Sequence, residues 1–223
     1  MADFWGRVTT RDGQARVGPG AEAPTVAGVV AAIESGEAPA ALASRLGVGP
    51  LDVLAAVAFD ALSDPLGLPL VRSTPRRPKL ADVLTEGTLT SLLPDTPRPA
   101  RLGFAAGLLQ ACDFWNASHE AAQQADDLGE RAVSPYWHGI AHRREPDAGN
   151  ASYWFRRVGN HALFPEIAAT DLGAAAGRLA PGGRWDPYAF VELCTRARGA
   201  DVPLARSIQR AEMWLLMRAS APG

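Results

Sequence analysis

The residues of this chain best suited to metal or acid–base chemistry are its four histidines, all of which lie within residues 119–161. His138 and His142 are four residues apart on a predicted helix, so their side chains share one face and lie one turn apart. Glu145 follows three residues later and extends the same stripe. Two imidazoles and a carboxylate are common ligands of Zn²⁺, Fe²⁺, Mn²⁺ and Cu²⁺. The spacing therefore predicts a site for a divalent transition metal.

Further polar groups lie close to this pair in the sequence. His119 belongs to the preceding predicted helix and becomes a third metal ligand if the two helices pack antiparallel; three protein ligands and an open position characterise catalytic metal sites. Asp113 and Glu145 are candidates for a further ligand or a general base. His161 is a candidate fourth ligand, acid–base group or support for a ligand. The same residues also fit a metal-free polar site or a hydrogen-bonded network between helices.

Aromatic and arginine side chains are concentrated around the histidines. Guanidinium groups bind carboxylate or phosphate in a bidentate manner and stack on aromatic rings. The residues predicted to bind a small anionic or sugar-like substrate are Trp137, Arg143, Arg144, Asn150, Trp154, Arg156 and Arg157. In the alternative interpretation, the first arginine pair and Glu145 form a solvated helix end, the tryptophans are core residues, and the second arginine pair binds acids such as Asp126 and Asp127. Asn150 fits a polar contact and a local helix cap equally well.

The block from Trp137 to His161 resembles a long motif of an uncharacterised bacterial and fungal family. Its pattern is W-H-G-I-x-H-R-R-E-P-D-x-x-N-A-x-Y-W-F-R-R-V-G-x-H, and residues 137–161 match it nearly throughout. The resemblance extends to Asp113 and residues 118–120 upstream, and to residues 184–187 and 209–214 downstream. Cys112 departs from the pattern, which has a histidine before the aspartate. The resemblance implies a shared site and no particular reaction.

A second resemblance concerns the N-terminal part. Residues 37–59 are similar to the small helix-turn-helix module of antitoxin-like proteins, a family that often binds DNA or a partner protein. A recognition helix needs Arg, Lys, Asn or Gln for base edges and phosphates. The helix after Pro50 carries Asp52 and Asp60 and no basic residue. DNA binding is therefore disfavoured, and a packing or homodimerisation module is expected.

The elements that must position these residues are helices, and the predicted fold class is all-α. Runs of alternating β-branched residues are nearly absent, which argues against a substantial sheet. We predict an irregular arm over residues 1–22, a small three-helix module over 23–63, a proline-rich linker over 64–79, and a multi-helix C-terminal domain over 80–223 that carries the site. Four prolines in the linker exclude a regular element there. Within the C-terminal domain we predict one long helix from Arg101 to about Asp126 and a shorter one from Ser134 to Glu145.

Composition excludes several classes of protein. The 223 residues are 47% hydrophobic and 21% charged, which is typical of a globular chain. A net charge of −2 gives no field that attracts nucleic acid or a membrane. Two cysteines form no disulfide framework and indicate a reducing compartment. Without a basic segment and apolar run at the start, or an apolar run of membrane length, the expected location is cytoplasmic.

Three functional hypotheses follow. The first is a metal-dependent enzyme, a hydrolase or oxidoreductase, that acts on a small anionic or polar substrate through Zn, Fe, Mn or Cu. The second is a metal-free protein that binds a small molecule, or a non-redox enzyme whose histidines act as acid and base. The third is a regulator or scaffold that uses its N-terminal module. No P-loop, G-x-S-x-G, dinucleotide-binding glycine pattern or C-x-x-C motif is present.

Overall fold

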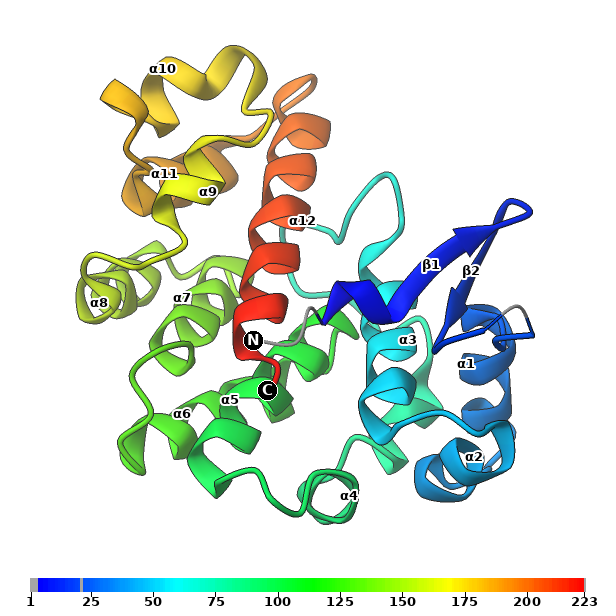
Figure 1. Ribbon diagram of the computed structural model, residues 1–223. Helices are drawn as coiled ribbons and strands as arrows, with labels where there is room; N and C mark the ends of the chain where they lie inside the picture. The colour runs from blue at the N-terminus through cyan, green and yellow to red at the C-terminus, as the bar shows by residue number, and fades with distance from the viewer. Residues whose placement is uncertain (1–3, 21, 223) are drawn as a thin grey trace.

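The computed structural model describes residues 4–20 and 22–222, and its architecture is predominantly all-α, as predicted. In chain order the elements are η1 (Trp5–Arg7), β1 (Val8–Arg11), β2 (Gln14–Val17), α1 (Val26–Glu34), α2 (Pro39–Leu46), α3 (Pro50–Leu62), η2 (Pro78–Asp82), α4 (Glu86–Leu92), α5 (Arg98–Ala111), α6 (Trp115–Asp127), α7 (Ser134–Arg144), α8 (Ala148–Val158), α9 (Phe164–Ala168), η3 (Gly173–Ala175), α10 (Ala176–Leu179), η4 (Pro181–Gly183), α11 (Pro187–Arg196) and α12 (Asp201–Ser220). Figure 1 shows α12 running through the middle of the molecule, with α3 on one side and α7 to α11 on the other.

The N-terminal arm, predicted to be irregular, contains a β-hairpin. Strands β1 and β2 pair antiparallel, with Val8 opposite Val17 and Arg11 opposite Gln14. The two residues between the strands, Asp12 and Gly13, have positive φ angles of 51° and 72°. Asp-Gly is a strong signal for such a tight turn, because both central residues must take positive φ. The sequence therefore contained a signal for this turn. Residues 1–3 and 21 of the predicted arm, together with residue 223, lie outside the described residues.

Helix α3 is a core helix rather than an exposed recognition helix. Residues 52–58 are all buried, and the helix packs against α5 and α12 as well as α1 and α2. Its first turn is held by Asp52, which accepts a hydrogen bond from the Gly49 amide at 2.7 Å and binds Arg7 at 2.8 Å. The faces of α3 needed to read DNA are thus occupied. Among the described residues no single helix has the length and hydropathy to cross a bilayer, and only α2 and α3 taken together, bent by 109°, meet that test.

The proline-rich segment over 64–79 is fastened to the helices that follow it. The Arg72 amide donates to the Arg144 carbonyl at 2.7 Å, and Arg144 Nε donates to the Pro69 carbonyl at 3.2 Å. Gln209 on α12 donates to the Leu68 carbonyl at 3.2 Å. Buried residues on both sides of the segment belong to one hydrophobic core. The segment therefore joins two parts of a shared core instead of spacing two separate bodies.

The long helix predicted from Arg101 to Asp126 is wrong, because the chain breaks at residues 112–114 into α5 and α6. Asp113 has a φ angle of 64°, a left-handed conformation that an aspartate tolerates but a helix interior does not. Its carboxylate accepts hydrogen bonds from Arg144 and from Ser73, the latter at 2.9 Å. Helix α6 consequently turns back along α5 and also lies against α7. Because of this break, His119 on α6 lies against α7, the helix that contains His138 and His142.

A close approach of α5 to α7 supports this arrangement and leads to the first prediction. A Cβ atom added at Gly107 would lie 2.7 Å from the indole of Trp137, whose Nε1 donates to Ser220 at 2.8 Å. We expect Gly107→Ala to lower the free energy of unfolding by about 1–3 kcal/mol, because a buried ring fixed on both sides cannot move away. Urea denaturation measures the change. Gly177→Ala, whose Cβ meets nothing within 4 Å, is the matched control, and equal stabilities of the two variants would contradict the packing described.

Candidate metal centre

Three histidines from α6 and α7 converge on one point. His119 Nε2 lies 2.9 Å from His138 Nε2 and 3.3 Å from His142 Nε2, and one ligand atom from each ring lies within 4.8 Å of the other two. Nitrogen ligands bound tetrahedrally at 2.0–2.1 Å from Zn²⁺ are separated by about 3.3–3.4 Å. The longer distance already fits that geometry, and the shorter one needs to open by about 0.4 Å. The sequence prediction of these three residues as a ligand set therefore matches a compact geometric cluster.

Helix periodicity and packing together produce the convergence. His138 and His142 are one turn apart on α7, and their rings stack with centroids 5.0 Å apart and planes 17° apart. His119 reaches them from α6, with ring centroids 4.3 Å from His138 and 4.9 Å from His142. Both histidines of α7 are buried, while His119 is half-buried and forms the solvent side of the cluster.

Glu145 lies on the outer side of His142. Its Oε2 is 3.0 Å from His142 Nδ1, so Nδ1–H donates to the carboxylate, and Nε2 is the ring nitrogen left to bind a metal. This carboxylate–histidine arrangement is the usual support for a metal ligand, because it fixes the ring and its tautomer. Glu145, predicted as a catalytic base or further ligand, is thus placed to orient His142.

Two tryptophans form walls on either side of the histidines. Trp154 of α8 stacks on His138, with centroids 3.7 Å apart and planes 14° apart, and Trp115 of α6 stacks on His119 at 5.1 Å and 22°. Trp115 Nε1 donates to the Ala141 carbonyl at 2.7 Å, which holds this indole against α7. Trp154 was predicted for the site, whereas Trp115 was not. Their stacking limits the freedom of two of the three rings.

Burial lowers the pKa of two of the three histidines, which favours their neutral form. The pKa of His138 is lowered from 6.5 to about 3, chiefly because its ring is desolvated, with further lowering by His119, His142 and Arg157. Burial, followed by the nearby His142, also lowers the pKa of His119. Metal ions bind neutral imidazole and must compete with protons for it. The environment thus already favours the protonation state that a metal requires.

The predicted substrate-binding role of Arg143 and Arg144 is corrected by their burial. Arg143 forms a bidentate ion pair with Glu212 of α12, both side chains being fully buried, and its guanidinium lies 4.4 Å from the Phe190 ring. Arg144 binds Asp113 and the carbonyls of Pro69 and Gln110. Neither guanidinium is accessible to a substrate, and neither belongs to a solvated helix end.

Three other predicted site residues are also engaged elsewhere. Asp113 is bound to Arg144 and is no metal ligand. His161 has both ring nitrogens in contact with backbone groups, Nε2 at 2.6 Å from the Ala132 carbonyl and Nδ1 accepting from the Leu163 amide at 3.1 Å. Trp137 is fully buried in the core. Because their polar atoms are already paired, these residues support the fold around the site.

The remaining candidates lie on α8. Asn150 donates its backbone and side-chain N–H groups to Asp147 at 2.9 and 2.8 Å, so it completes the helix cap. Arg157 binds Asp126 at 2.8 Å, as the alternative interpretation anticipated, and its guanidinium lies 5.1 Å from the Trp154 ring. Arg156 is exposed. Of the four predicted arginines, only these two reach solvent.

Arg72 is a residue near the centre that the sequence did not single out. Its guanidinium lies 4.6 Å from the Trp115 ring centroid, and its Nη1 is 3.8 Å from Glu145 Oε1. It comes from the proline-rich segment, whose sequence carries no periodic pattern to indicate which side chain faces the helices. Burial raises the pKa of Cys112 to about 12, so this thiol stays protonated and is poorly suited to act as a nucleophile.

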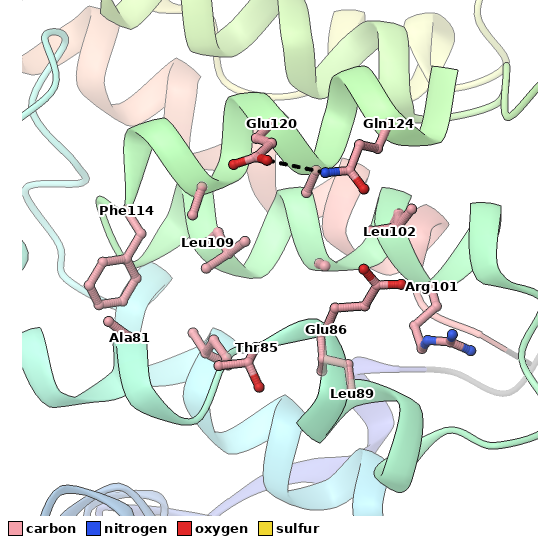
Figure 2. A pocket seen from close by; sticks show the side chains of 14 residues that line it. Ala81, Thr85, Glu86, Leu89, Arg101, Leu102, Leu109, Phe114, Glu120 and Gln124 are labelled. Carbon is pink, nitrogen blue, oxygen red and sulfur yellow. Dashed lines mark hydrogen bonds between the residues drawn. The ribbon is translucent and has the colours of Figure 1, made fainter. Parts of the chain in front are cut away.

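A separate cavity of about 310 Å³ lies on the opposite face of α6 from His119. Figure 2 shows Glu120 and Gln124 on one side of it and Thr85 and Glu86 on the other. Its interior is mostly apolar, and helix α6 separates it from the three imidazoles. A molecule bound in this cavity would not reach the histidine cluster.

No protein-family model, curated protein or solved structure matches this chain. The resemblance of residues 137–161 to the bacterial and fungal family, and that of residues 37–59 to antitoxin-like modules, therefore stay predictions.

Proposed function

We propose that this protein binds one divalent transition metal through Nε2 of His119, His138 and His142 and uses it as the centre of an enzyme acting on a small anionic or polar substrate. The convergence of three imidazoles carries the proposal: His119 Nε2 lies 2.9 Å from His138 Nε2 and 3.3 Å from His142 Nε2, and one ligand atom of each ring lies within 4.8 Å of the other two. Three lone pairs so close together repel one another unless a cation or shared protons lie between them. Three neutral ligands leave a fourth position for water or substrate, which is the arrangement of catalytic rather than structural zinc sites.

The surrounding residues have distinct roles in this proposal. Glu145 fixes the tautomer of His142, and the two tryptophans restrict the rings of His119 and His138 and shield the centre from bulk water. Arg157, which lies beside Trp154, is the predicted residue best placed to bind an anionic substrate. It would release Asp126 and bind the substrate in its place. Asp126 would keep Arg131, which also binds it at 2.8 Å. The metal would supply a bound hydroxide for hydrolysis or a redox centre for oxidation.

The second candidate is a metal-free acid–base site built from the same histidines. The 2.9 Å separation of His119 and His138 also suits an N–H···N hydrogen bond. His138 Nδ1 is buried without a partner. A metal on Nε2 places the proton on Nδ1, where it costs about 1–3 kcal/mol. The free energy gained from metal binding must therefore outweigh the cost of this unpaired N–H group.

Elemental analysis tests the choice between the two. Untagged protein purified without chelator should contain about one equivalent of metal. A His138→Ala/His142→Ala double variant should contain none while keeping its helical circular dichroism, because one imidazole cannot retain the ion. His161→Ala is the matched control and should keep the full complement. Absence of metal from the wild-type protein, also after reconstitution with Zn²⁺, Fe²⁺, Mn²⁺ and Cu²⁺, would exclude the metal-dependent enzyme in favour of the acid–base site.

A further inference from the structure

We propose that Arg72 is a positioning residue of the metal centre, which holds Glu145 and Trp115 in place and, through them, two of the three ligand histidines. This inference rests on the proposed metal site. It assigns a role to the proline-rich segment, which is remote from the histidines in sequence. Arg72 does not reach the ligand nitrogens, so its effect must pass through the groups it contacts.

The backbone around Arg72 is held firmly enough for such a role. The Arg72 amide donates to the Arg144 carbonyl at 2.7 Å, one residue before Glu145. The next side chain, Ser73, donates to Asp113 at 2.9 Å, next to the start of α6. Pro69 and Pro75 flank this stretch and restrict its backbone freedom. The segment is thus tied to the end of α7 and to the start of α6, the two helices that supply the ligands.

The side chain of Arg72 contacts one supporting group of each helix. Glu145 has one oxygen, Oε2, 3.0 Å from His142 Nδ1 and its other oxygen, Oε1, 3.8 Å from Arg72 Nη1. The carboxylate is therefore held between the imidazole and the guanidinium. On α6, the guanidinium lies 4.6 Å from the Trp115 centroid, and this indole stacks on His119. A flat cation can make both contacts at once, because it stacks on a ring while its N–H groups point to a carboxylate.

The expected effect is on metal affinity more than on folding. The Arg72 side chain is about half exposed and its ion pair with Glu145 is long, so the pair itself adds little stability. Groups that orient metal ligands typically change affinity by 10- to 100-fold. Arg72 acts one contact further out, and we expect a loss of about ten-fold, at the lower end of that range.

The experiment compares Arg72→Met with Arg76→Met. Arg76 lies on the same segment, is similarly exposed and pairs with Asp64 at 3.5 Å, away from the histidines. Dissociation constants for Zn²⁺ are measured by competition with a chromophoric chelator, and the visible spectrum of the Co²⁺-substituted protein reports the geometry of the ligands. Arg72→Met should raise the dissociation constant about ten-fold and alter the Co²⁺ spectrum, while Arg76→Met should change neither. Arg72→Lys should recover only part of the affinity, because it restores the charge without the planar stack.

A combined variant shows whether Arg72 acts through Glu145. Once Glu145→Gln has removed the carboxylate, Arg72→Met should cost less affinity than it does alone. Equal losses in both backgrounds, equal losses from Arg72→Met and Arg76→Met, or an unchanged constant in Arg72→Met would each overturn the proposal. In all three cases wild-type protein still binds metal, so the proposed function stands. Failure of the proposed function is seen separately, as absence of metal from the wild-type protein.

Discussion

Arg144→Met should lower the free energy of unfolding by about 3–5 kcal/mol, the cost of leaving a buried charge without its partner. Arg144 is fully buried and is the charged partner of Asp113, which is itself buried. Its guanidinium also satisfies the carbonyls of Pro69 and Gln110, which lose their donor in the variant. Urea denaturation at pH 7 measures the loss, and the largest disturbance should occur at the junction of α5, α6 and the proline-rich segment.

Two further variants separate burial from charge. Arg156→Met removes an exposed arginine of the same motif and should change stability by less than about 0.5 kcal/mol. Asp113→Asn combined with Arg144→Met should recover part of the loss, because the neutral amide needs no counter-charge and asparagine tolerates positive φ. If Arg144→Met and Arg156→Met were equally stable, the buried ion pair would be excluded.

The metal-free protein should lose stability as the pH falls below 6.5. In the folded state the pKa of His138 is lowered to about 3 and that of His119 is also lowered. Between pH 6.5 and 3 the unfolded chain therefore binds more protons than the folded one, and the free energy of unfolding decreases with falling pH. The slope approaches about 1.4 kcal/mol per pH unit for His138 alone as the pH falls below 6.5, and His119 adds to it.

This slope is measured by urea denaturation in the presence of chelator. The informative range is about pH 5 to 6.5, because most carboxylates remain ionised there and their ion pairs persist. His138→Gln removes the titrating ring and should flatten the profile. Gly177→Ala, which removes no titrating group, should leave the slope unchanged. A flat wild-type profile in this range would contradict the neutral, buried state of His138.

Local signals predicted much of the secondary structure and part of the site. Ser134 and Pro135 marked the start of α7, and Pro146 marked its end, because proline restricts the backbone next to it. The predicted serine cap is wrong: Ser134 is the first helical residue, and its amide donates to the carboxylate of Glu130. The four-residue spacing of His138 and His142 placed both rings on one face by helix geometry alone. The Asp-Gly turn signal of the hairpin was equally local. Its two strands, of 4 residues each, are too short to give a clear alternating pattern and were not predicted.

The helix break at Asp113 could not be predicted from the neighbouring residues. Helical spacing continues through residues 112–114, and nothing in the neighbouring sequence indicates a left-handed aspartate. Asp113 takes that conformation because Arg144, which is 31 residues away, and Ser73, which is 40 residues away, hold its carboxylate. Likewise, Arg143 looked free because its partner, Glu212, is 69 residues further along. Arg72 was missed for the same reason.

The sequence by itself determined the helical character of this protein, the shared face of His138 and His142, and the candidacy of His119, since each depends on the regular repeat of a helix. The tertiary structure alone decided that His119 joins the pair, that Arg143 and Arg144 face buried acids, and that the proline-rich segment covers the end of α7. These outcomes depend on which polar groups are buried by packing, because a buried polar group needs a hydrogen-bond or ion-pair partner. In this protein such partners lie far apart along the chain.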